Sequence, residues 1–249
     1  MNIAVWLSYE GTRYDGWQKQ GNTDRTIQGK LEAVLEKSEG CPVEVHGSGR
    51  TDAGVHAEGQ VANFHLKRKA DTGQLLAYMN RYLPDDIAVR EARIMPERFH
   101  SRLNAVKKTY RYQIEMGPKK DVFKRHFYYG LGRKLDVGEM ERAAACLMGT
   151  HDFKSFCGNK KMKKSTVRTI ESIRFERVGD SCLHIAYTGD GFLQQMVRIL
   201  TGTLVEVGLG RQKAENLPSI LAAKDRQASG FTAPPEGLVL ESVDYGEML

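Results

Sequence analysis

The order of predicted secondary-structure elements is the feature of this sequence that most restricts its fold. Residues 2 to 9 alternate apolar and polar side chains, as a half-buried strand does. Residues 26 to 38 place Ile27, Leu31 and Leu35 on one helical stripe. The predicted elements of the first part of the chain are a strand at 2–9, a helix at 26–38, strands at 43–46 and 59–66, a helix at 71–83 and a strand at 86–94. Asp71 is the predicted N-cap of the second helix, which ends before Pro84.

The same β-α-β-β-α-β order returns in the remainder of the chain. Its predicted elements are a strand at 107–116, a helix at 136–148, a hairpin at 167–188, a helix from 192 to 208, an extra helix at 211–224 and a strand at 237–245. The sequence therefore predicts an α+β fold of two duplicated ferredoxin-like halves, residues 1–98 and 99–249. In this plan helices cover one face of each sheet and leave the other face open, with a cleft between the two halves.

Composition places few limits on the chain beyond those of an ordinary globular protein. It has 249 residues, of which 41% are apolar and 27% charged. The four cysteines form no C-x-x-C pair, which argues against a disulfide framework and a zinc site and favours a reducing cytoplasm. No basic leader and no apolar run long enough for a membrane helix is seen, so we expect a protein with no membrane partner.

Positive charge is concentrated in two stretches. Residues 100 to 134 hold ten lysines and arginines against two acids, a net charge of +8, whereas the whole chain carries +6. The stretch "NKKMKKSTVR" at 159 to 168 reads as an exposed basic loop. Such clusters are typical of a polyanion partner and favour a structured RNA, although solvated lysine surfaces also produce this pattern.

Three ionisable side chains lie in the most glycine-dense part of the sequence. In "HGSGRTDAGVHAEGQVANF", which starts at residue 46, Arg50, Asp52 and His56 stand among four glycines. Glycine permits positive φ and close backbone approach, so the stretch is predicted to be a tight turn that presents polar groups. One alternative is a solvated polar hairpin, and another is that Asp52 only caps its own turn through its side chain.

Asp52 is the candidate for chemistry. A carboxylate repels RNA phosphates, so its presence at an RNA surface favours a reaction over simple binding. No phosphate loop, dinucleotide fingerprint or metal-ligand cluster occurs in the sequence, so no cofactor and no metal is expected. A carboxylate acting alone on RNA suits attack or base catalysis at a sugar carbon, which indicates chemistry at a glycosidic bond.

The stretch "GRTDAGVHAEGQVANF" at 49 to 64 resembles the signature of the tRNA pseudouridine synthase A family. Further matching blocks are "YEGTRYDGWQKQ" from Tyr9, "TIQGKLE" from Thr26, "MNRYLPDDIAV" from Met79, "FHSRLNAVKKTYRY" from Phe99, "GTHDFKSFC" from Gly149, "FLQQMVRILTGTLVEVG" from Phe192 and "TAPPEGLVL" from Thr232. The resemblance covers nearly the whole chain. It implies the pseudouridine synthase fold and the isomerisation of uridine to pseudouridine, by base flipping, at positions 38–40 in the anticodon stem-loop of tRNA.

The resemblance also implies roles for five residues. Asp52 matches the essential aspartate, and Arg50 matches an arginine that supports base flipping. Tyr110 matches the tyrosine that stacks on the target base and helps remove its C5 proton, and Arg198 matches the arginine that pairs with the catalytic carboxylate. Leu238 matches a leucine that packs against the pocket. Ordinary core positions for Tyr110 and Leu238 are the alternatives.

Family members form homodimers, so a homodimer is expected here as well. Gln195, Asn63 and Phe231 depart from the family pattern, which more often has two histidines and a proline at these positions, and these departures bear on substrate choice. His56 and His151 are interpreted as structural histidines, with a role in orienting the substrate as the alternative. Rival functions are a related enzyme for another structured RNA, a non-catalytic RNA-binding protein and a hydrolytic RNA N-glycosylase.

Overall fold

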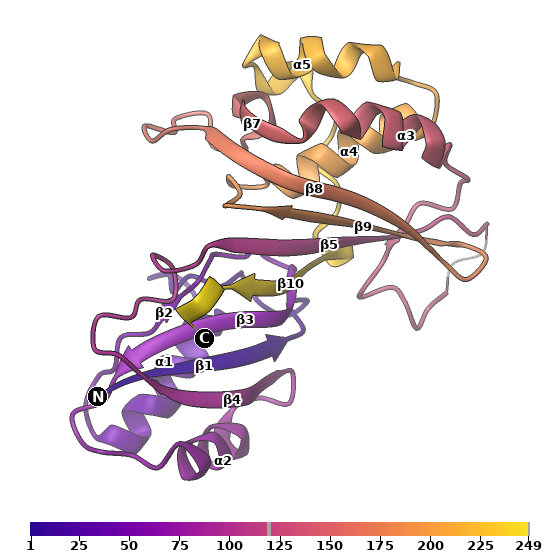
Figure 1. The fold of residues 1–249 in the computed structure, drawn as a ribbon. Helices are drawn as coiled ribbons and strands as arrows, with labels where there is room; N and C mark the ends of the chain where they lie inside the picture. Colours follow the sequence, from indigo (N-terminus) through magenta and orange to yellow (C-terminus); the bar gives the residue numbers. More distant parts are fainter. Residues whose placement is uncertain (119–120, 249) are drawn as a thin grey trace. The chain divides into compact units, whose positions relative to one another are not determined.

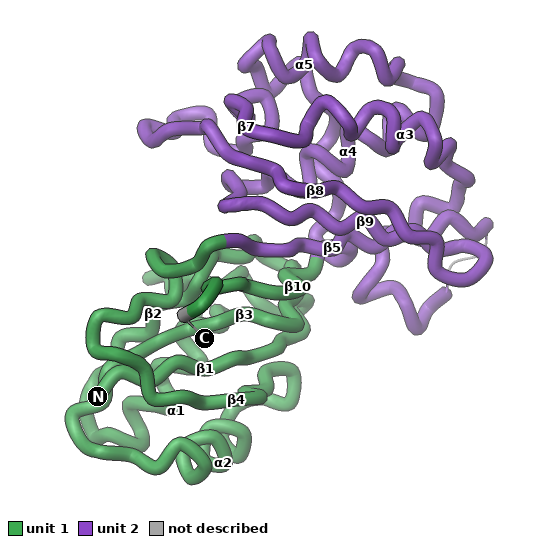
Figure 2. Tube along the Cα trace, in the orientation of Figure 1, with its two compact units in different colours: residues 1–106, 239–249 green, residues 107–238 purple. Residues whose placement is uncertain are grey.

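The computed structural model describes residues 1–118 and 121–248, which form two compact units (Figure 2). Unit 1 comprises Met1–Val106 together with the C-terminal segment from Val239, and unit 2 comprises Lys107–Leu238. Both units combine a sheet with helices, which confirms the α+β class. The predicted halves 1–98 and 99–249 divide the chain differently, because the last strand belongs to unit 1.

Unit 1 combines a sheet with the helices α1 and α2, and its short strand β2 pairs with β3 (Figure 1). Its strands run in the order β4-β1-β3-β10, β1 is antiparallel to β3 and β4, and β10 is parallel to β3. The elements are β1 (Asn2–Tyr9), α1 (Ile27–Glu39), β2 (His46–Gly47), β3 (His56–His65), α2 (Thr72–Tyr82), β4 (Ile87–Met95) and β10 (Leu238–Asp244). Leu31 and Leu35 of α1 and Ile3 of β1 are fully buried in its core.

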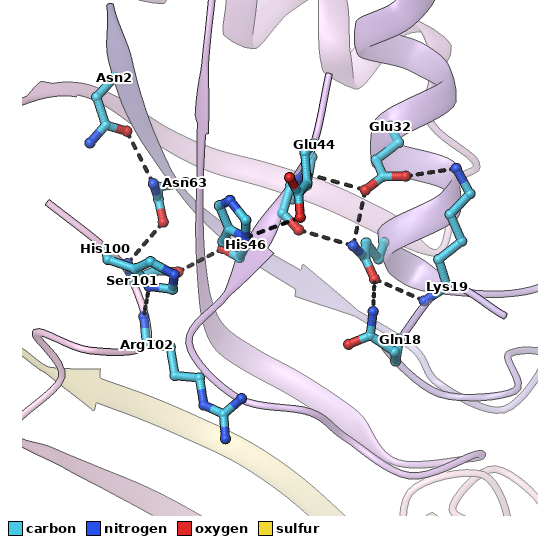
Figure 3. A network of polar contacts seen from close by, with 12 residues as sticks. Asn2, Gln18, Lys19, Glu32, Glu44, His46, Asn63, His100, Ser101 and Arg102 are labelled. Carbon is cyan, nitrogen blue, oxygen red and sulfur yellow. Dashed lines mark hydrogen bonds and ion pairs between the residues drawn. The ribbon is translucent and has the colours of Figure 1, made fainter. Parts of the chain in front are cut away.

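The second face of the unit 1 sheet is partly covered, whereas the sequence predicted an open face. Ala4, which alternates with Ile3 along β1, belongs to a second buried cluster with Val61, Phe99 and Tyr245. The segment after β4 is also held there by polar contacts, because the Asn63 side chain accepts from the Ser101 amide at 2.8 Å and donates to Asn2 Oδ1 at 3.1 Å (Figure 3).

Unit 2 contains a sheet in the order β5-β9-β8-β7, with β6 parallel to β5. Helices α3, α4 and α5 lie together on one side of β8 and β9 (Figure 1). Its strands are β5 (Lys107–Glu115), β6 (Tyr129–Gly130), β7 (Gly149–Asp152), β8 (Val167–Val178) and β9 (Cys182–Gly189). Its α-helices are α3 (Val137–Ala144), α4 (Met196–Gly208) and α5 (Leu217–Ala223). Neither β6 nor β7 was predicted from the sequence.

The strand predicted at 43–46 is wrong except at its last residue, because side chains of α1 satisfy the backbone there. Glu32 Oε1 accepts from the Val45 amide at 3.2 Å, and Gln28 Nε2 donates to the Val45 carbonyl at 3.1 Å (Figure 3). Val43 and Val45 are buried, which accounts for their apolar pattern without a sheet partner.

Three predicted helices are shorter than the sequence indicated. The helix predicted from 192 begins at Met196, since Gln195 before it has a left-handed φ of 60°. The helix predicted at 136–148 ends at Ala144 and continues as a 3-10 turn. The helix predicted at 211–224 is a 3-10 turn at Ala214–Asn216 followed by α5. The N-cap at Asp71 is confirmed, because its side chain accepts from the Gln74 amide at 2.8 Å.

Among the described residues, no helix is both long and apolar enough to span a bilayer.

Candidate active site

Asp52 lies in a tight turn that leads into β3 of unit 1. Its main-chain carbonyl accepts a hydrogen bond from the Val55 amide at 3.2 Å, which closes the turn. Gly54 adopts a φ of +77°, so the glycine supplies a conformation that side chains disfavour. Asp52 is partly exposed and Arg50 is exposed, as expected for a turn that presents polar groups. The strand before the turn, β2, has only two residues, so the turn does not join two long strands.

The segment from Tyr9 to Trp17 braces this turn through main-chain contacts. The Gly54 amide donates to the Tyr14 carbonyl at 3.2 Å, and the Trp17 amide donates to the Thr51 carbonyl at 3.1 Å. Thr51, before Asp52, and Gly54, after it, are therefore both hydrogen-bonded to this segment.

Two glycines make this close approach possible. A Cβ atom on Gly11 would lie 2.0 Å from the Val55 carbonyl oxygen, and one on Gly16 would lie 2.7 Å from the Thr51 carbonyl oxygen. Gly16 also has a φ of +98°. The two glycines of the sequence block "YEGTRYDGW" are thus explained by the close packing of this segment against the turn around Asp52.

A buried side-chain network holds the start of the turn. The Tyr9 hydroxyl bonds Thr51 Oγ1 at 2.8 Å, and Gln60 Nε2 donates to the Gly49 carbonyl at 3.0 Å. Ser48 Oγ donates to Gln60 Oε1 at 2.6 Å. Burial raises the pKa of Tyr9 to about 12, so its hydroxyl stays neutral at physiological pH. The side chains of this network are uncharged, so Asp52 contributes the carboxylate of the turn.

The two histidines interpreted as structural make contacts that fit that interpretation. His56 is buried, and its Nδ1 accepts from the Gly11 amide at 3.0 Å. His151 Nε2 lies 2.8 Å from the Met148 carbonyl oxygen, and its ring packs edge-on against Phe153.

Tyr110 lies in β5 of unit 2, in an aromatic environment. It is buried, its ring meets Phe192 edge-on with centroids 5.2 Å apart, and Tyr187 of β9 stands opposite it in the sheet. Both interpretations of Tyr110, a sheet-face tyrosine and a base-stacking ring, are compatible with this position.

Arg198 lies in the first turn of α4, in unit 2. Its Nε donates to the Ala233 carbonyl at 2.7 Å, and its own carbonyl accepts from the Ala233 amide at 3.0 Å. The next carbonyl, of Pro234, accepts from the Tyr112 hydroxyl at 2.7 Å. Arg198 and Tyr112 therefore fix the chain just before Leu238, which is buried at the start of β10.

The predicted site residues are divided between the two units. Arg50 and Asp52 share the turn in unit 1, and Tyr110, Arg198 and Leu238 belong to unit 2. The hydrogen bonds of Tyr9 and Gln60 to the turn were not predicted from the sequence, because single polar residues in alternating strands have no distinctive spacing.

The basic stretches are partly paired with acids. Lys107 lies 3.3 Å from Glu171, and Lys124 lies 3.6 Å from Asp121. Lys119 and Lys120 lie outside the described residues. The four lysines of the predicted basic loop, Lys160, Lys161, Lys163 and Lys164, are exposed.

No group of three or more histidine, cysteine, aspartate or glutamate side chains in the described part of the chain is arranged to hold a metal ion. All four cysteines are free thiols.

Comparison with known proteins defines the class to which this fold and turn belong. A family model described as tRNA pseudouridine synthase matches residues 6–127 and 143–246. A tRNA pseudouridine synthase A of Bacillus sp. strain KSM-64 is 45% identical over 98% of this chain and 99% of the relative. That of Halalkalibacterium halodurans is 44% identical over 95% of this chain and 90% of the relative, and that of Acetivibrio thermocellus is 42% identical over 98% and 99%. The chain belongs to the tRNA pseudouridine synthase family.

Proposed function

We propose that this protein isomerises uridine to pseudouridine in tRNA, with Asp52 as the catalytic carboxylate. The observation that carries the proposal is the family match, which runs through both units and includes the braced turn of Asp52. An enzyme needs its reactive group in a fixed geometry, and the contacts of Thr51, Gly54 and Val55 give the turn that rigidity.

The reaction conserves every atom of the nucleotide except for exchanged protons. The bond between N1 of uracil and C1′ of ribose breaks, the base turns, and a bond between C5 and C1′ forms. C5 then loses its proton and N1 gains one, so no external oxidant, reductant or co-substrate is consumed. The carboxylate of Asp52 assists cleavage, either by attack at the sugar or by promoting release of the base.

The other residues support that carboxylate and the base. By the family resemblance, Arg198 is the arginine that pairs with the catalytic carboxylate. Tyr110 stacks on the uracil and takes part in removal of the C5 proton, for which its buried aromatic setting beside Phe192 is suited. Arg50, which is exposed on the same turn as Asp52, occupies the space of the flipped base, and Leu238 packs against the base.

Three finer features belong to the same proposal. The target lies at positions 38–40 in the anticodon stem-loop, the enzyme acts as a homodimer, and it works in the cytoplasm. The family resemblance of the sequence blocks supports them, and the exposed lysines at 160–164 supply charge for RNA phosphates.

The test is incubation of the purified protein with tRNA transcripts that carry tritium at C5 of uridine. The proposal predicts release of tritium to water and pseudouridine on the 3′ side of the anticodon arm. Free uracil in place of pseudouridine would identify an N-glycosylase. Binding without any release from tRNA would overturn the proposal in favour of a binding protein or an enzyme for another RNA.

A further inference from the structure

A cavity of unit 2, separate from the residues assigned to isomerisation, combines an exposed aromatic ring with basic and polar side chains. Its volume is about 470 Å³, within the range of small-ligand pockets. It is lined by residues of α4, of the turn after α4 and of the loop before β10, among them Thr203, Glu206, Arg211, Arg226, Ser229 and Phe231.

Phe231 is held rigidly although its side chain is 37% exposed. Its carbonyl oxygen lies so close to Gly202 that a Cβ atom there would be 1.9 Å away. The Gly230 amide before it donates to Thr203 Oγ1 at 2.9 Å, and the Ala233 amide after it donates to the Arg198 carbonyl at 3.0 Å. The loop is therefore fixed to α4 on both sides of the ring.

Arg226 holds the same loop from within. Its guanidinium donates to the Gly230 carbonyl and to Thr232 Oγ1, both at 2.9 Å, and to Ser229 Oγ at 3.0 Å. A partly exposed aromatic ring on a loop whose main chain is already fixed requires less ordering of that loop when a ligand stacks on the ring, which favours binding there.

The neighbours of Phe231 fit a nucleotide. The Tyr129 ring meets it edge-on with centroids 6.3 Å apart, which leaves a second aromatic group beside the first. Arg211 is 55% exposed and lies 3.2 Å from Glu206, which orients the guanidinium. An arginine can bind a phosphate, and aromatic rings stack on unpaired bases, so the two together provide for one nucleotide of a single-stranded segment.

We infer that the Phe231 cavity binds one unpaired nucleotide of the RNA substrate, with the base stacked on Phe231 beside Tyr129 and a phosphate on Arg211. This inference rests on the proposed function, because it takes the substrate to be RNA.

The first test measures the dissociation constant for tRNA in an Asp52→Asn background, where turnover does not interfere. Phe231→Ala is expected to weaken binding about tenfold, since one base stack is removed, whereas Phe231→Trp is expected to restore it. Tyr82→Ala is the matched control, because Tyr82 is an aromatic residue of unit 1 that is 43% exposed. It is expected to leave affinity within about twofold. Thermal unfolding of each variant establishes that it is folded.

The second measurement is direct. A stacked base quenches indole fluorescence, so the Phe231→Trp protein is expected to lose emission on addition of tRNA and of a uridine hexanucleotide, beyond the change seen with Tyr82→Trp. Unchanged affinity of Phe231→Ala together with no such quenching would overturn the inference. If the wild-type protein releases tritium from tRNA in that case, the proposed function stands and only the cavity assignment fails. If the wild type releases none, the proposed function itself fails.

Discussion

Residues outside the Asp52 turn fix its geometry. Gly11 and Gly16 admit the carbonyl groups of Val55 and Thr51, and Tyr9 bonds the Thr51 side chain. The turn itself was predicted from its glycines, and the resemblance of the family blocks supplied the residues that we propose to act in catalysis. The contacts between the Tyr9–Trp17 segment and the turn could not be predicted from the sequence. The segment lies about 40 positions before the turn and contacts it mainly through main-chain atoms.

Replacement of Gly11 by alanine is expected to displace the turn. The added Cβ would lie 2.0 Å from a main-chain oxygen, which has no freedom to rotate away. We expect a loss of about 1–3 kcal/mol in the free energy of unfolding, measured in urea, and a larger relative loss of tritium-release activity. Gly21→Ala is the control, because nothing lies within 4 Å of its Cβ position. Equal activity of the two variants would show that the turn does not depend on this contact.

Replacement of Tyr9 by phenylalanine is expected to loosen Thr51 and lower activity, with a cost of about 1 kcal/mol in stability at pH 7. Tyr187→Phe, which removes a buried hydroxyl bonded to Thr201 at 2.9 Å, is the control. Its stability should fall similarly but its activity less, and equal loss of activity would contradict a specific role for Tyr9.

The same hydroxyl predicts part of the alkaline pH dependence. The pKa of Tyr9 is raised to about 12 in the folded protein, against 10.0 for an ordinary tyrosine. Its contribution is complete below pH 10 and is lost as the pH rises toward 12, because the unfolded chain releases the proton first. Urea unfolding at several pH values should show a shallower decline for Tyr9→Phe than for the wild type.

Helices and strands follow local sequence signals except where a side chain from another element satisfies the backbone. The sequence predicted α1, α2, β1 and β5 to within one residue at each end, and it predicted β8 and β9 as a hairpin. The strand at 43–46 failed because Gln28 and Glu32 bond Val45, and no pattern within 43–46 contains that information. The late start of α4 has a different cause, which is the left-handed backbone of Gln195 directly before it.

The N-cap of α2 tests an element-level prediction that the structure confirmed. Asp71→Ala removes the acceptor of the Gln74 amide, so we expect a loss of about 1 kcal/mol in the free energy of unfolding with unchanged isomerisation. Asp71→Ser keeps an acceptor and should recover most of the stability. Identical unfolding curves for all three proteins would contradict the cap.

The described part of the chain forms two α+β units, and the repeated order of predicted elements indicated an α+β fold of two halves. The sequence did not predict that the last strand joins unit 1, because strand pairing between distant segments leaves no trace in local periodicity. The concentration of charge in two stretches was visible in the sequence, and part of it is paired with acids in the structure.

The exposed lysines at 160–164 provide the test at this scale. Replacement of Lys160, Lys161, Lys163 and Lys164 by glutamine is expected to reduce the slope of log affinity for tRNA against log salt concentration, by roughly 0.7 to 0.9 for each phosphate that the loop no longer neutralises. Lys67→Gln with Lys69→Gln, which removes exposed charge from unit 1, serves as the control. A slope that stays unchanged in the four-lysine variant would mean that this loop does not contact RNA.

The central claim is that the Asp52 carboxylate carries out uridine isomerisation, and the most direct measurement is single-turnover tritium release from tRNA by Asp52→Asn, with tRNA affinity measured in parallel. Asparagine is nearly the same size but has no negative charge. We predict no detectable release and an affinity within about tenfold of the wild type, or ~1.4 kcal/mol. Continued formation of pseudouridine by Asp52→Asn would contradict the account.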